Sequence, residues 1–143
     1  NLGKRQVKSP KIYIRDSGIL HGLLGIESYD DLLGNPIIGS SFEGLIVENI
    51  LQSVPNRTKS SFYRTSAGAE IDLILELPKN NGLWAIEIKL GLIPKPSKGF
   101  YSAIEDLNPK RAFMVYSGQG HYQINEKVEA ISLYDITKIL SNI

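Results

Sequence analysis

The sequence contains no cysteine and only two histidines, His21 and His121, among its 143 residues. The lack of cysteine excludes disulfides, thiolate zinc sites and cysteine nucleophiles, and two histidines are too few for a multi-histidine metal site. An excess of one charge is also missing, because sixteen Lys and Arg are balanced by fifteen Asp and Glu, which leaves a net charge of +1. Any surface that binds nucleic acid or a membrane would therefore be local.

Long apolar runs are absent as well. Charged residues interrupt the longest apolar stretches within about ten residues, well short of the roughly 20 that span a bilayer, and no signal peptide is visible. We therefore expect no membrane association and a cytoplasmic location. The composition, 42% hydrophobic and 22% charged, is that of a globular domain. Because the chain begins Asn-Leu-Gly-Lys without a Met, we expect a fragment of a longer protein.

The apolar pattern predicts an α/β fold, a mixed sheet with helices packed on it. Residues 11–15 alternate in the manner of a strand, and Asp16 can cap a short helix over 19–24. Residues 27–39 are expected to form a loop before the best helix, which has Ser40 or Ser41 as its N-cap and ends near Val54. The remaining predicted elements are strands over 60–65, 70–77, 83–91, 111–117 and, more weakly, 122–133, and helices over 97–107 and from Asp135 to Ile143.

Four charged residues occupy positions where the pattern predicts burial. Glu43 lies on the apolar stripe of the long helix. Asp72 lies on the strand over 70–77, and Glu87 and Lys89 share one face of the next strand. If these two strands are neighbours, the four side chains meet in one patch. The faces opposite Asp72 and Glu87 are expected to hold Ile71, Leu73 and Leu75 on the first strand and Trp84, Ile86 and Ile88 on the second.

Three carboxylates and a lysine form a sensible chemical unit. Clustered, buried carboxylates have raised pKa values unless a cation is present, and Mg²⁺ or Mn²⁺ prefers such oxygen ligands. A bound ion of this kind can polarise a phosphodiester and supply a hydroxide nucleophile. Lys89 would orient or deprotonate that water, or stabilise charge on the phosphate. A surface ion pair would explain Glu87 and Lys89 alone, whereas the ordered set of four favours a site.

The ordered set resembles the motif of the PD-(D/E)xK phosphodiesterase superfamily, which has the fold of restriction endonucleases and archaeal junction resolvases. Its helical acid, strand Asp and following (D/E)-x-K match Glu43, Asp72, Glu87 and Lys89 one by one. The proline of the superfamily motif has no counterpart before Asp72. The blocks KIYIRDSGILHGLLG, SFEGLIVENIL, FYRTSAGAEIDLIL and AIEIKLG are similar to a domain of unknown function found C-terminal to prokaryotic AAA-type ATPase modules.

The resemblance implies a restriction-endonuclease-like domain over residues 40–143, with the order helix-strand-strand-strand-helix-strand. Residues 1–39 would be an extension from a missing ATP-binding module, and no G-x-x-x-x-G-K-[ST] motif occurs in this chain. The resemblance further implies DNA as substrate, Mg²⁺ or Mn²⁺ as cofactor, and the four motif residues as catalytic groups, the three acids also binding the metal. A homodimer is left open, because such folds often pair to cut both strands.

Basic residues flank the predicted site: Lys59 and Arg64 before it, and Lys95 and Lys98 after it. They would line a groove for DNA phosphates, or else they belong to solvated loops. The N-terminal stretch with Lys4, Arg5, Lys8, Lys11 and Arg15 is interpreted as a linker. The alternative function is a catalytically silent nuclease-fold module that tethers DNA or associates ATPase subunits.

Overall fold

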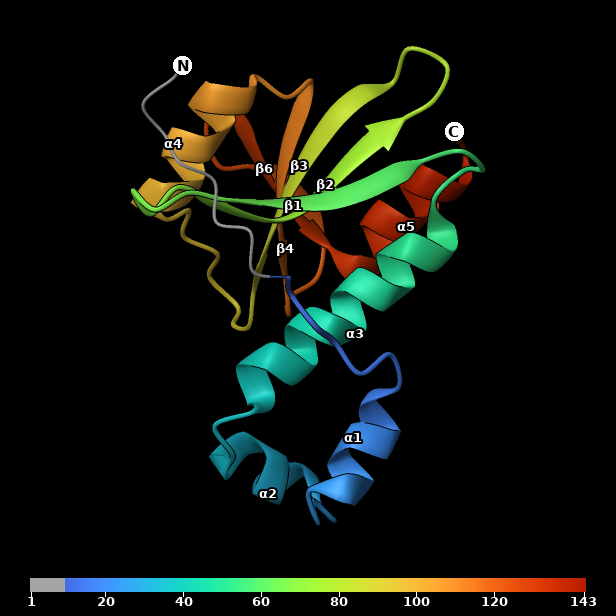
Figure 1. The fold of residues 1–143 in the computed structure, drawn as a ribbon, viewed down its shortest axis with the longest axis vertical. Coiled ribbons are helices and arrows are strands. Elements are labelled where there is room, and N and C mark those ends of the chain that lie inside the picture. The colour runs from blue at the N-terminus through green and yellow to red at the C-terminus, as the bar shows by residue number, and fades with distance from the viewer. Residues whose placement is uncertain (1–9) are drawn as a thin grey trace.

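The computed structural model describes residues 10–143 (Figure 1), so the predicted basic residues Lys4, Arg5 and Lys8 lie outside it. Six strands form one mixed sheet in the order β1-β2-β3-β4-β6-β5. β2 is antiparallel to β1 and β3, β4 is parallel to β3 and β6, and β5 is antiparallel to β6. The strands are β1 (Lys59–Arg64), β2 (Glu70–Leu77), β3 (Gly82–Lys89), β4 (Arg111–Tyr116), β5 (His121–Gln123) and β6 (Val128–Ser132).

Five helices complete the described part of the chain, and three of them cover the sheet. α3 and α5 pack on one face and α4 packs on the other, each over its own apolar cluster. The mixed α/β fold predicted from the sequence is therefore confirmed, as is the order of elements from α3 to β4. No helix within residues 10–143 is long and apolar enough to cross a membrane. The helices are α1 (Ser17–Leu23), α2 (Tyr29–Gly34), α3 (Ile38–Ser53), α4 (Lys98–Leu107) and α5 (Leu133–Ser141).

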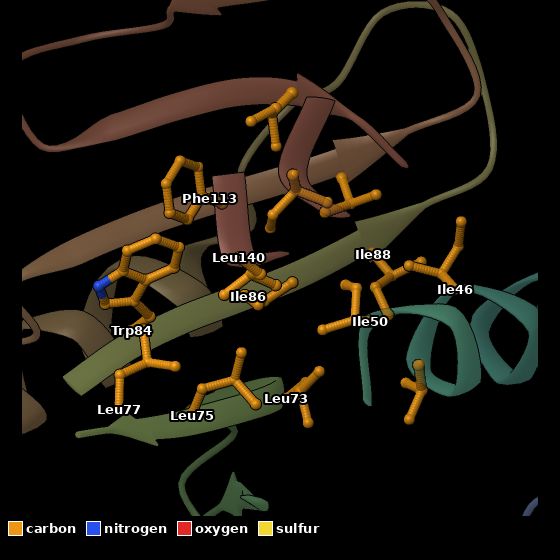
Figure 2. Packing of buried hydrophobic residues seen from close by; sticks show 14 residues of the cluster. Ile46, Ile50, Leu73, Leu75, Leu77, Trp84, Ile86, Ile88, Phe113 and Leu140 are labelled. Carbon is orange, nitrogen blue, oxygen red and sulfur yellow. The ribbon is translucent and has the colours of Figure 1, made fainter. Parts of the chain in front are cut away.

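The larger core lies between the sheet and α3 with α5, as Figure 2 shows. The predicted stripe of α3 is confirmed, because Ile46, Val47 and Ile50 are buried there. The face of β3 that carries Trp84, Ile86 and Ile88 packs against them, also as predicted. Glu43, one turn before the buried residues of the stripe, is only partly buried. The packing of α3 thus sets where that carboxylate meets the sheet.

Three local predictions fail. Residues 27–39 contain the helix α2, because Ser28 and Asp31 form a reciprocal capping box. α3 begins at Ile38, so neither Ser40 nor Ser41 caps it. The last helix is capped by Ser132, whose hydroxyl accepts a hydrogen bond from the backbone N–H of Asp135. The first error is a missed helix, and the other two concern where a helix begins.

Residues 11–15 do not form a strand. They belong to a segment without helix or strand, residues 10–16, that we call the N-terminal strap, which crosses α3 on its way to α1 (Figure 1). Asp16 ends the strap and caps α1 as predicted, its side chain accepting from the N–H of Ile19. α1 and α2 lie at the end of α3 that points away from the sheet (Figure 1). The strap thus connects this small helical projection to the edge of the site.

A β-bulge interrupts β2 at the predicted site. Ser61 pairs with Ile74 and Tyr63 with Ile71, so β2 has one more residue than β1 between these pairs. The extra residue switches the face of the strand. Ile71 packs with the α4 cluster whereas Leu73 packs with the α3 and α5 cluster. The prediction that Ile71 shares a face with Leu73 is therefore wrong, and the bulge is what re-aims Asp72.

Candidate active site

Asp72 lies where β2 and β3 separate. Their ladder runs from Leu77 to Leu73, which pairs with Ile86. Beyond it, Asp72 Oδ2 accepts a hydrogen bond of 2.9 Å from the backbone N–H of Ile88. The side chain thus satisfies a β3 backbone donor at the position where the strands part. This contact holds the Asp72 carboxylate next to Glu87.

Glu87 is a buried carboxylate with one unsatisfied oxygen. The residue is 4% exposed, and Oε1 forms an ion pair of 2.9 Å with Lys89 Nζ. Oε2 is buried and has no hydrogen-bond partner among residues 10–143. Burial and then the negative charge of Asp72 raise the pKa of Glu87 to about 7, against the opposing effect of Lys89. An unpaired buried carboxylate oxygen is costly, and a cation would compensate it.

Lys11, which was not among the predicted site residues, connects Glu43 to Asp72. Lys11 Nζ donates to Glu43 Oε1 at 3.0 Å and to Asp72 Oδ1 at 2.7 Å, and it lies 3.5 Å from Glu70 Oε1. Burial opposes the charge of Lys11, but the bonds to Asp72 and Glu43 outweigh it and raise its pKa. The Tyr13 hydroxyl donates to the same Glu43 oxygen at 2.5 Å. An ammonium ion therefore lies between the two carboxylates.

The structure brings the four predicted residues together as two linked groups. Glu43 and Asp72 share Lys11, and Glu87 with Lys89 adjoins Asp72. Within residues 10–143 no three acidic or histidine side chains are grouped so as to hold a metal ion. The donor chemistry nevertheless fits a hard divalent cation, because all the donors are carboxylate oxygens and Glu87 Oε2 is unpaired. What occupies the cation position between Glu43 and Asp72 is the ammonium of Lys11.

Sequence reasoning missed Lys11 and Tyr13, although a signal was present. The alternation over 11–15 reflects an extended segment whose polar side chains face the protein: Arg15 continues the series by pairing with Glu48 of α3 at 2.8 Å. Ile12, on the opposite side, is 86% exposed. The polar residues at every second position of the strap therefore match acids on the helix. The strand prediction used the same alternation and assigned no partner to either side.

The four predicted DNA-binding residues are distributed over two regions. Arg64 Nε lies 3.8 Å from Glu70 Oε1, and Lys95 and Lys98 are exposed in and after the connection from β3 to α4. The start of α4 packs against the β1–β2 turn, which puts Lys98 at the Arg64 end of β1. Lys59 lies at the opposite end of that strand. Arg64 and Lys98 are thus closest to a common surface.

Comparisons with known proteins place the chain among domains without an assigned role. The family described as "Domain of unknown function (DUF4143)" matches residues 38–136. Uncharacterized proteins of Mycobacterium tuberculosis and Mycobacterium bovis are each 40% identical over 132 residues, or 92% of this chain. The chain spans 29% of the length of these relatives. No solved structure shows significant similarity to it.

Proposed function

The chain belongs to the family of the domain of unknown function DUF4143, and from its site we propose that it is a metal-dependent phosphodiesterase domain acting on DNA. The observation that carries the proposal is Glu87: a buried carboxylate with an unpaired oxygen, next to Asp72 and paired with Lys89. A buried carboxylate oxygen without a hydrogen-bond partner destabilises the fold, so an acid in this state is more typical of a functional site than of a structural ion pair.

The order of elements supports the same proposal. A helix carrying Glu43 precedes a strand carrying Asp72, and the adjacent antiparallel strand carries Glu87 and Lys89. This is the arrangement that the resemblance to the PD-(D/E)xK superfamily implies, and with it a restriction-endonuclease-like fold. The bulge of β2 is consistent with a functional role, since bulges are frequent next to active sites, where they re-aim a side chain.

Asp72 and Glu87, with Glu43 as a further ligand, would hold Mg²⁺ or Mn²⁺, which would supply a hydroxide nucleophile and polarise the phosphodiester. Lys89 has a defined part in this site. Burial opposes its charge, but the hydrogen bond to Glu87 outweighs burial and raises the pKa of Lys89. The ammonium of Lys89 would therefore stabilise charge on the phosphate or orient the attacking water. Its partly exposed ammonium can reach a substrate.

Incubation of the full chain with supercoiled plasmid or branched DNA and Mn²⁺ tests the proposal. Asp72→Asn keeps the acceptor for the Ile88 N–H but removes the charge, and Lys89→Met removes the ammonium. We expect each to reduce cleavage by about 100-fold or more. Lys138→Met, which changes an exposed lysine on α5, is the matched control and should cleave like the wild type. Equal cleavage by all the variants would identify a contaminant and reject the assignment.

A second function is favoured by a separate observation. Lys11 already neutralises part of the acidic cluster, and no three acids within residues 10–143 are grouped for a metal. The domain would then be a catalytically silent module for tethering DNA or associating subunits. Calorimetric titration with Mn²⁺ separates the two: a folded protein that binds no Mn²⁺ at millimolar concentration supports the silent module. Loss of DNA affinity on changing Arg64 and Lys98 together would then identify tethering.

The proposal extends to the longer protein. Because the chain spans 29% of its relatives, most of their length lies outside the matched segment. We propose that a prokaryotic AAA-type ATPase module precedes this domain in the same polypeptide and delivers or remodels its DNA. ATP-dependent stimulation of cleavage in the full-length protein, lost when the nucleotide is a non-hydrolysable analogue, is the expected result.

A further inference from the structure

We propose that the N-terminal strap is an internal plug of the site. Lys11 occupies the cation position between Glu43 and Asp72, and the strap has to withdraw before a divalent ion can bind there. This inference rests on the proposed function and adds its regulation: the domain would be held in a metal-poor, inactive state by its own chain.

Lys11 and a divalent ion compete for the same oxygen atoms. Lys11 Nζ lies 2.7 Å from Asp72 Oδ1 and 3.0 Å from Glu43 Oε1. A Mg²⁺ ion binds oxygen at about 2.1 Å, so an ion that joins these two carboxylates would occupy the space of the ammonium. Two cations in contact at a partly buried position also repel strongly. Occupation by Lys11 and occupation by the metal therefore exclude each other.

Tyr13 adds a second contact at the same place. Its hydroxyl donates to Glu43 Oε1, the atom that also accepts from Lys11. The ring lies over α3 at Gly44, where a Cβ would meet the ring at 3.5 Å. Because both donors use one oxygen, the strap takes up the Glu43 oxygen that faces Asp72. Withdrawal of the strap would free that oxygen.

The strap is attached weakly enough to be displaced. Ile12 and Ile14 are 86% and 46% exposed, so little apolar surface holds the segment down. Hollows of about 360 and 170 Å³ adjoin it, and both are lined in part by Lys11 and Tyr13. In the described part of the chain, residues 10–15 make no backbone–backbone hydrogen bond to the sheet or to α3. The polar side chains of the strap are therefore a major part of its attachment. A metal ion would replace the contacts of Lys11 and Tyr13 with Glu43 and Asp72, whereas the Arg15–Glu48 pair would still hold the end of the strap near α1.

Calorimetric titration of the full chain with Mn²⁺ tests the plug. Lys11→Met should bind Mn²⁺ about tenfold more tightly than the wild type or better, because the competing ammonium is gone. Tyr13→Phe, which removes one hydrogen bond and no charge, should give an increase of about two- to threefold. Lys138→Met is the matched control for the lost charge, and its affinity should equal that of the wild type. Adding Asp72→Asn to Lys11→Met should abolish the gain.

The outcomes separate this inference from the proposed function. Binding of Mn²⁺ with equal affinity by the wild type and Lys11→Met would overturn the plug and leave the metal site intact. Absence of binding in every variant, with folding verified by circular dichroism, would overturn the metal site and the plug with it. If Lys11→Met fails to fold, Tyr13→Phe carries the same comparison, and an unchanged affinity in that variant would overturn the plug.

Proteolysis of the wild type gives a second readout. Trypsin cleaves after Lys11, and the bond is protected while the ammonium is paired with Asp72 and Glu43. Saturating Mn²⁺ should therefore accelerate cleavage at this bond in the wild type, whereas Asp72→Asn should show no response to Mn²⁺. An unchanged cleavage rate despite Mn²⁺ binding would show that the strap stays in place, and would overturn the plug.

Discussion

Two clusters of charged side chains lie on the sheet, and they balance their charges differently. In the arginine cluster, made of Arg111, His121 and Glu129, one carboxylate faces two basic groups. Arg111 Nη2 lies 3.0 and 2.8 Å from the two Glu129 oxygens, and His121 Nε2 lies 2.7 Å from one of them. Burial opposes ionisation of Glu129, but the hydrogen bonds from Arg111 and His121 outweigh it and lower its pKa.

At the candidate site the balance is reversed. Four carboxylates share the ammonium groups of Lys11 and Lys89, with Arg64 near the rim. The pKa of Glu87 rises where that of Glu129 falls. In an ion-pair network that stabilises the fold, the charged groups have hydrogen-bond partners of opposite charge. This site instead keeps an unpaired carboxylate oxygen and more negative than positive groups. That difference is the physical reason to assign chemistry to one cluster and structure to the other. The four acids are Glu43, Glu70, Asp72 and Glu87.

The largest expected effect concerns stability against pH in metal-free buffer. Folded Glu87 keeps its proton up to about pH 7, whereas its ordinary pKa is 4.5. The folded state binds more protons between these values, so the free energy of unfolding falls as pH rises through this window. The loss attributable to this group is on the order of 3 kcal/mol. Urea denaturation should show that Glu87→Gln removes this decline.

Glu129→Gln is the matched control from the other cluster. Because the pKa of Glu129 is lowered, its ionised form stabilises the fold above its ordinary pKa, and that stability is lost as pH falls through the folded value. The two substitutions should therefore change the pH dependence with opposite signs. A Glu87→Gln protein whose pH profile matches the wild type would show that Glu87 is ionised in the folded state, which contradicts the contrast between the clusters.

A smaller effect is expected from breaking the arginine cluster. The Arg111 guanidinium lies over the rings of Trp84 and Phe113 at 5.1 and 4.4 Å as well as pairing with Glu129. Arg111→Met leaves that carboxylate without its main partner, so we expect the free energy of unfolding to fall by about 2 kcal/mol. Mn²⁺ affinity should not change. A marked loss of Mn²⁺ binding in the folded variant would show that the two clusters are coupled.

The smallest effect is expected at the exposed pair of Lys59 and Glu76. Their charged atoms lie 3.8 Å apart and both side chains are mostly exposed. Lys59→Gln should change the free energy of unfolding by less than about 0.5 kcal/mol, because solvent screens such pairs. Chemical denaturation measures this value. A loss comparable to that of Arg111→Met would mean that surface pairs also contribute strongly, and the distinction between clusters would lose its basis.

Much of the fold was predictable from periodicity. The strands β1, β2 and β3 and the helices α3 and α4 were all predicted, because their apolar residues recur at strand or helix spacing. Helix starts were less predictable, since several residues near each start can act as caps. The helix α2 was missed because its six residues contain too little apolar pattern to distinguish it from a loop.

The residues of the candidate site could be predicted from the sequence, but the contacts between them could not. The positions of Glu43, Asp72, Glu87 and Lys89 followed from residue type and spacing. The bulge that turns Asp72 leaves no trace in an alternating pattern, because one extra residue on β2 is defined only by its pairing with β1. The alternation over 11–15 indicated an extended segment with Lys11 on its polar side, but not its partner, because Asp72 lies 61 positions away along the chain.

Local patterning by itself determined which segments become helices and strands, and which acidic residues lie near the core, because both follow from side-chain spacing along a regular backbone. Tertiary structure alone decided that Asp72 faces Glu43, that one oxygen of Glu87 stays unpaired, and that Lys11 fills the gap between carboxylates. These outcomes depend on register and on distances between segments far apart in the chain, which no local pattern encodes.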